Sequence, residues 1–180
     1  MTGVRDPNRQ VTYEGLRRST PNMFPKPLLD RLISIDETLP LKYGKRYWLR
    51  VSEACAEAWH ENPATRDVLD EATGQVRKEK IRYRIKDLVG VASLAKLGES
   101  IIKSHIDSGK NDRLESLVAK LVEVDWEKRS DNPWMRSQAG FAGQRELFEI
   151  LHALVYSDVR PGASQSVVQV LDSDEVEVTE

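Results

Sequence analysis

Residues 76–108 read VRKEKIRYRIKDLVGVASLAKLGESIIKSHIDS. Apolar side chains recur in this stretch at the spacing of one helix face. They are Ile81, Ile85, Leu88, Ala92, Ala95, Ile102 and Ile106, and the face is widened by Val89, Leu94, Leu97 and Ile101. We therefore predict one long central helix over about 76–108, and Gly109 is a suitable residue to terminate it.

The first part of this stretch also fits a β-strand. Cations alternate with apolar residues at the two-residue period of a strand: Lys80, Arg82, Arg84 and Lys86 with Ile81, Tyr83 and Ile85. We favour the helix because the helical stripe continues to residue 106.

Four further helices are predicted on either side of the central one. The first covers about 26–37, where Pro27 occupies an early helical position and Leu28, Leu29, Leu32 and Ile33 share one face. The second lies within 47–62 and has Val51, Ala54, Cys55, Ala58 and Trp59 on one face. Helices over about 114–125 and 147–155 follow, each with an apolar stripe.

The predicted fold is all-α, with about five helices around one core. Five of the eight prolines fall in the first 40 residues, so residues 1–24 are expected to be a loop-rich segment before a helical domain at 25–160. Residues 161–180 contain five acidic residues and no Lys or Arg. We expect them to form a flexible or weakly structured acidic tail.

Composition indicates one globular domain. The chain has 180 residues, 39% hydrophobic and 31% charged, with a net charge of -2. A single cysteine excludes an intrachain disulfide and suits a reducing compartment. No apolar run approaches the roughly 20 residues of a membrane span, and the N-terminus lacks a signal-peptide pattern. We expect a cytoplasmic protein with no membrane partner.

The usual motifs of catalysis are absent from the sequence. It has no phosphate-binding loop, no dinucleotide-binding glycine pattern, no serine-hydrolase elbow and no HExxH zinc motif. The histidines, His60, His105 and His152, lie on three different predicted helices, and the first two are best explained by helix C-terminal carbonyls. Cys55 lies on an apolar face and is expected to be an inert packing residue. We therefore expect no catalysis, no cofactor and no metal.

Two stretches contain candidate binding residues. The basic run at 77–86 offers candidate phosphate contacts: Arg77, Lys78, Lys80, Arg82, Arg84 and Lys86. The alternative for this run is a solvated helix face. The second stretch is a predicted interhelical loop that could recognise a partner or nucleic acid: Trp126, Lys128, Arg129, Trp134 and Arg136. Its alternative, which is the commoner case, is that the Trp rings fill a helix junction.

The order of these features resembles the C-terminal helical part of DndB-type DNA-sulfur-modification proteins of the DGQHR-domain family. The resemblance covers about 52–156. It rests on AEAWHENP (56–63), a linker into a basic stretch, LVGVASLAKLGESII (88–102), LVEVDWEKRSDNPW (121–134) and AGFAGQ (139–144). The DGQHR signature itself does not occur, and Gly143-Gln144-Arg145 is a partial echo of it.

The resemblance implies a role in regulating DNA phosphorothioation genes. The leading hypothesis is a non-catalytic helical module that binds DNA or a DGQHR-containing partner of a modification system. The alternative is a protein interaction module that does not contact DNA and docks through the loop around Trp126 or through the acidic tail. An enzyme whose site is assembled from scattered carboxylates is a third, weaker hypothesis.

Overall fold

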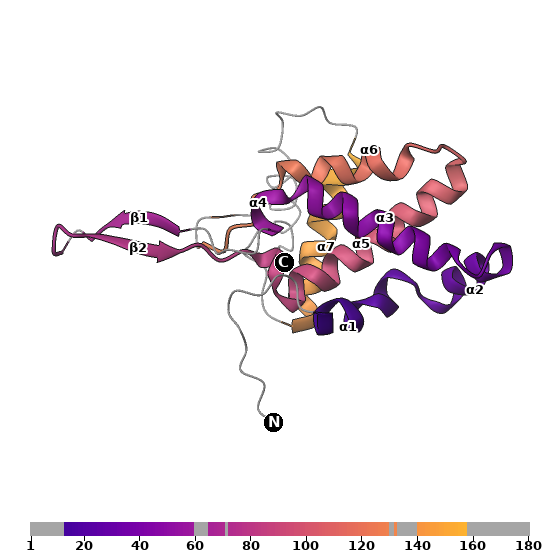
Figure 1. Cartoon of the computed structure of the whole chain (residues 1–180), viewed down its shortest axis with the longest axis horizontal. Helices are drawn as coiled ribbons and strands as arrows, with labels where there is room; N and C mark the ends of the chain where they lie inside the picture. The colour runs from indigo at the N-terminus through magenta and orange to yellow at the C-terminus, as the bar shows by residue number, and fades with distance from the viewer. Residues whose placement is uncertain (1–12, 60–64, 71, 130–131, 133–139, 158–180) are drawn as a thin grey trace, which may run out of the picture.

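A computed structural model describes residues 13–59, 65–70, 72–129, 132 and 140–157. In these residues the chain is mostly helical, with one two-stranded antiparallel sheet that departs from the all-α prediction (Figure 1). The elements are α1 (Tyr13–Met23), α2 (Lys26–Ile35), α3 (Leu39–Ala54), α4 (Ala56–Trp59), β1 (Thr65–Leu69), β2 (Val76–Lys80), the short 3-10 helix η1 (Arg84–Lys86), α5 (Leu88–Ser108), α6 (Arg113–Ala119), the 3-10 helix η2 (Lys120–Glu123) and α7 (Gly140–Tyr156).

Helix α5 is the centre of the fold, as predicted. It packs against α1, α6 and α7, and 13 of its 21 residues are buried, which is the mark of a helix enclosed on several sides. At Gly98 a Cβ atom would lie 2.9 Å from Met23 Cε and 3.0 Å from the Tyr47 ring. The absence of a side chain at this position therefore lets α1 and α3 approach α5 closely.

The long helix predicted over 76–108 is wrong in its first third, because α5 begins at Leu88. The preceding residues form β2 and η1. The Asp87 side chain accepts a hydrogen bond from the Gly90 N–H at 3.0 Å and so caps α5. A Cβ on Gly90 would lie 2.1 Å from the Arg84 carbonyl oxygen. The chain therefore turns tightly against the first turn of α5, and the helix cannot extend backwards.

The expectation of a loop-rich segment over 1–24 is wrong for residues 13–23, which form α1; residues 1–12 lie outside the described residues. Pro21 falls in the last turn of α1, and the helix ends two residues later, at Met23. Gly15, Ser19 and Met23 are buried at four-residue spacing. Two small residues and one flexible apolar residue thus form the face of α1 that packs on α5.

The other predicted helices are present, with shifted ends. Helix α2 matches its prediction closely, and Gly109 ends α5 with φ 64°, in the left-handed region where glycine is favoured. Helix α3 starts earlier than predicted and stops at Cys55, after which α4 forms one more turn. Helix α6 continues directly as the 3-10 helix η2. Helix α7 starts earlier than predicted, at Gly140.

Strands β1 and β2 form a hairpin that projects from the helical body (Figure 1). Among the described helices, none combines the length and apolar character that crossing a bilayer requires. The predicted acidic tail at 161–180 lies outside the described residues.

Candidate nucleic-acid interface

The β1–β2 hairpin presents the first half of the predicted basic run. Its strands pair from Thr65 opposite Lys80 to Leu69 opposite Val76. The turn contains Gly74 with φ 66°, and the Asp70 side chain accepts the backbone N–H of Ala72 at 3.0 Å. Nine of the ten strand residues are exposed, with Val68 half-buried. The hairpin is therefore a narrow ribbon that is open to solvent on both faces.

Four of the six predicted phosphate contacts are exposed on this ribbon or at its base: Arg77, Lys78, Lys80 and Arg82. Lys78 and Lys80 lie two residues apart and so share one face, while Arg77 lies on the other. Within the described part of the chain, no ion pair occupies any of these four cations. Their charge is available to a ligand.

The other two predicted contacts, Arg84 and Lys86, belong to the body. The side chain of Arg84 is only 11% exposed and pairs with Asp87 at 3.0 Å. The Lys86 ammonium lies 5.9 Å from the centre of the Tyr83 ring, and burial lowers the pKa of Lys86. Both side chains are therefore engaged with residues outside the two strands.

Where the structure describes the predicted interaction loop, its Trp side chain is buried and its cations are engaged in ion pairs. Trp126 is 4% exposed, so its ring fills a junction in the core, as in the structural alternative. Lys128 pairs with Asp87 at 3.2 Å, and Arg129 pairs with Glu127 at 3.0 Å. Trp134 and Arg136 lie outside the described residues.

The two predicted sites meet at the base of the hairpin. The Arg84 N–H donates to the Trp126 carbonyl at 2.8 Å, and the Lys128 N–H donates to the Arg82 carbonyl at 2.7 Å. Tyr83 and Glu127 form an isolated antiparallel bridge between the same segments. Residues 126–128 therefore act as a third strand-like segment that fixes the hairpin to the body.

Side chains reinforce this junction. Arg66 on β1 binds the Glu127 carboxylate at 2.6 Å, and the Asn132 amide donates to the carbonyls of Asp125 and Glu127 at 2.8 and 2.7 Å. Asn132 is fully buried. No sequence pattern indicates this junction, because its residues are far apart along the chain and share no motif or period.

The titratable groups near the junction do not form a reactive centre. Burial raises the pKa of the Cys55 thiol to about 12, which keeps it protonated at neutral pH. The Tyr83 hydroxyl donates to Glu57 at 3.1 Å, and burial, with this hydrogen bond, raises the pKa of Tyr83 to about 12. The described residues contain no group of three or more side chains suited to holding a metal ion.

The histidines do not come together in the described structure. His105 is buried in the last turn of α5 and meets the Tyr43 ring edge-on at a centroid distance of 5.5 Å. Its place in the last turn is the one that the helix-end explanation requires, while burial lowers its pKa and so disfavours the charged form. His152 stacks near Tyr156 on α7, and His60 lies outside the described residues.

Comparisons with protein families, with curated proteins and with solved structures give no match to this chain.

Proposed function

We propose that the chain is a DNA-binding module in which the helical body supports the β1–β2 hairpin and the exposed cations of the hairpin contact phosphates. The observation that carries the proposal is the position of Arg77, Lys78, Lys80 and Arg82, which are exposed and free of ion pairs in the described structure. Cations that neutralise phosphates release counterions, and this release drives non-specific binding to DNA.

The shape of the hairpin supports the same proposal. A two-stranded ribbon fits the major groove of DNA, and several β-ribbon proteins read DNA in this way. Because the whole chain has a net charge of -2, attraction to DNA has to come from a local basic surface. The hairpin projects from the helical body and carries its cations with it (Figure 1).

The acidic side chains of the hairpin indicate how it would face DNA. Glu79 approaches Arg66 at 3.5 Å on one face, and Asp70 is engaged in the turn. The other face presents Lys78 and Lys80 with a single acid, Asp67, opposite Lys78. We infer that the Lys78 and Lys80 face lies against the phosphates and that Arg82 extends the contact toward the body.

The resemblance to DndB-type proteins adds a biological setting to this proposal. In that setting the module contributes DNA binding, or binding of a DGQHR-containing partner, to the regulation of DNA phosphorothioation or defence genes. The experiments below test the DNA contact itself, which does not depend on the resemblance.

The test is fluorescence anisotropy with a labelled DNA duplex over a range of salt concentrations. In the test variant, Arg77, Lys78, Lys80 and Arg82 are all replaced by Gln. Each lost phosphate contact reduces the slope of log K against log salt by about 0.9, so loss of the three contacts of Lys78, Lys80 and Arg82 reduces it by about 2.7. A matched control replaces four exposed cations of the body by Gln: Lys26, Arg31, Lys110 and Arg145.

We expect the hairpin variant to lose most of its affinity at low salt, while the control variant keeps most of it. Both variants should unfold with nearly the wild-type stability because the substituted side chains are exposed. No association of the wild-type chain at low salt, or equal losses in the two variants, would contradict the proposal.

The alternative is a protein interaction module that does not contact DNA. Its two proposed docking features are the loop around Trp126 and the acidic tail. The burial of Trp126 in the core argues against the first of them. One observation favours a protein interaction surface. Helices α1, α2 and α3 line an apolar groove, which lies on the part of the body away from the hairpin. Anisotropy separates the two functions, since a module of this second kind shows no salt-dependent binding to DNA.

A further inference from the structure

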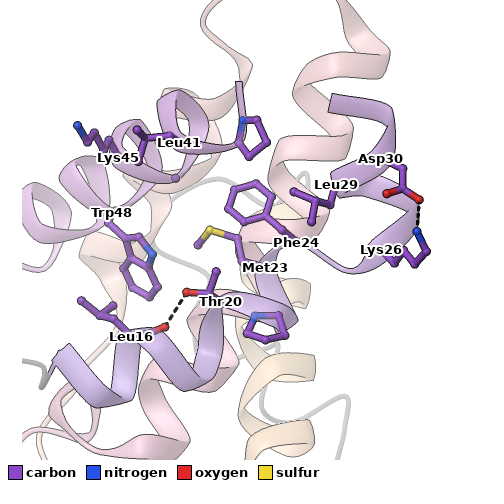
Figure 2. Close-up of a pocket in the computed structure, with 13 residues that line it drawn as sticks. Leu16, Thr20, Met23, Phe24, Lys26, Leu29, Asp30, Leu41, Lys45 and Trp48 are labelled. Atoms are coloured by element: carbon purple, nitrogen blue, oxygen red, sulfur yellow. Dashed lines mark hydrogen bonds and ion pairs between the residues drawn. The ribbon is translucent and has the colours of Figure 1, made fainter. Parts of the chain in front are cut away.

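Helices α1, α2 and α3 enclose an open apolar groove of about 930 Å³ (Figure 2). Its size falls within the range of about 300–1,000 Å³ that is usual for binding pockets. Met23 and Phe24 form its floor, and Leu16, Leu29 and Trp48 point into it from the surrounding helices (Figure 2). The groove is separate from the hairpin and from the junction at its base.

The groove leaves large apolar side chains uncovered. Leu41 is 61% exposed at its edge, and Phe24 and Trp48 are only half-buried. Contiguous exposed apolar surface of this kind marks binding sites in folded proteins. Met23 adds an adaptable thioether to the floor, which suits a surface that has to fit a flexible segment.

The charged side chains that line the groove are two lysines and one aspartate: Lys26, Lys45 and Asp30. Lys45 lines the groove and has no ion pair within the described residues, whereas Lys26 is paired with Asp30 at 2.8 Å. An occupant that combines apolar side chains with acidic ones would therefore complement this surface.

The chain contains one segment of this composition outside the described structure. Residues 166–180 read SVVQVLDSDEVEVTE. They include six aliphatic residues, five acidic residues and no Lys or Arg. The aliphatic residues suit the floor and walls of the groove, and the acidic ones suit Lys45.

The connecting residues are long enough for this segment to reach the groove. The nine steps from residue 157 to residue 166 span up to about 30 Å. A helix of about 20 residues is about 30 Å long, and α5, the longest of the described helices, has 21 residues. The connection can therefore cross the helical body from the end of α7.

We propose that the α1–α2–α3 groove is a docking site for the chain's own C-terminal segment, residues 166–180. In this arrangement Val167, Val168, Val170 and Leu171 cover the apolar groove, and the acids that follow pair with Lys45.

The test places a nitroxide on the segment and measures paramagnetic broadening of amide signals in the full chain. The label is attached through Glu177→Cys. Cys55 does not compete for the label because it is buried and its pKa is raised to about 12. We expect the amides of Leu41, Gly44 and Lys45 to lose most of their intensity, while those of the β1–β2 hairpin keep theirs.

Two variants of the labelled chain test the chemistry of docking. Leu41→Asp places a negative charge at the groove edge, and Leu49→Asp is its matched control because Leu49 is 57% exposed on α3 and does not line the groove. Leu41→Asp should restore the amide intensities and Leu49→Asp should leave them broadened. Lys45→Glu should restore them as well, most completely at low salt, where charge repulsion is least screened.

Three results would overturn the proposal. One is the absence of broadening at the groove in the labelled full chain. Another is equal broadening in the Leu41→Asp and Leu49→Asp variants. The third comes from mixing isotope-labelled chain with unlabelled chain that carries the nitroxide: broadening of equal strength in this mixture would assign the groove to the segment of a second copy. No DNA is present in these measurements, so they do not depend on the proposed DNA contact.

Discussion

The helical body and the β1–β2 hairpin differ sharply in how their residues meet solvent. In α5, 13 of 21 residues are buried, whereas nine of the ten strand residues of the hairpin are exposed. The body therefore has a core that can hold its shape by hydrophobic burial. An isolated two-stranded hairpin is marginally stable in water, so the hairpin depends on its junction with residues 126–128.

The basic run at 77–86 lies partly in the hairpin and partly in the body. Its alternating cations look alike in the sequence, yet Lys78 and Lys80 are exposed on the hairpin while Arg84 is held by Asp87 in the body. Burial, rather than charge pattern, therefore separates cations that can bind a ligand from cations that stabilise the fold.

The largest expected effect tests the contrast in packing. Leu97→Ala removes a fully buried side chain from α5, and we expect it to lower the free energy of unfolding by about 2–5 kcal/mol. Leu69→Ala on β1 is the matched change at a position that is 60% exposed, and it should alter the free energy by no more than about 0.5 kcal/mol. Urea denaturation followed by circular dichroism measures both. Similar losses in the two variants would mean that the hairpin is packed against the body in solution.

The next effect tests the tight turn between the hairpin and α5. Gly90→Ala would place a Cβ 2.1 Å from the Arg84 carbonyl oxygen, a backbone atom that cannot move without displacing η1. We expect a loss of about 2–3 kcal/mol, at the upper end of the usual cost of overpacking. The control is Gly44→Ala in α3, where the new Cβ would make an ordinary contact at 3.5 Å with Phe24.

Gly44→Ala should stabilise the chain by up to about 1 kcal/mol, because alanine is favoured over glycine within a helix. Chemical denaturation under the same conditions gives both values. A Gly90→Ala variant as stable as the wild type would show that η1 does not pack on α5 as tightly as the structure indicates.

The smallest expected effect is the contribution of His105, in the helical body, to the pH dependence of stability. Burial, and then the charge of Arg46, lowers the pKa of His105, while Glu115 and Asp112 act weakly in the opposite direction. As the pH falls below about 6.5, the unfolded chain binds a proton at this histidine before the folded chain does. Its contribution to stability is therefore present above that pH and is lost as the pH falls.

His105→Asn should make stability less dependent on pH between about 6.5 and 5, as measured by urea midpoints at a series of pH values. The wild-type curve falls more steeply than the variant curve over this window. Parallel curves would show that His105 binds a proton equally well in the folded and unfolded states.

The sequence predicted the helical elements that have a clear apolar stripe. Residues 88–108, 26–35 and 113–123 form helices close to the predicted positions because their one-face periodicity matches the faces that the fold buries. Helix α1 was missed because the prolines near it suggested a loop, while its packing face is built from Gly15 and Ser19, which carry no apolar signal. The strand at 76–80 was missed because the predicted helix was extended from the apolar stripe after Asp87 toward the N-terminus, as far as residue 76.

For the candidate interface, the positions of the positive charges can be read from the sequence, whereas their exposure to solvent depends on the folded chain. Composition and periodicity depend on neighbours along the chain, so they could identify the basic run and the central helix. The pairing of residues 82–84 with 126–128 joins segments about forty residues apart, and the packing of α5 selects the point at which the helix begins. Such long-range contacts have no local signature, because their free energy arises only when the folded chain brings the two segments together.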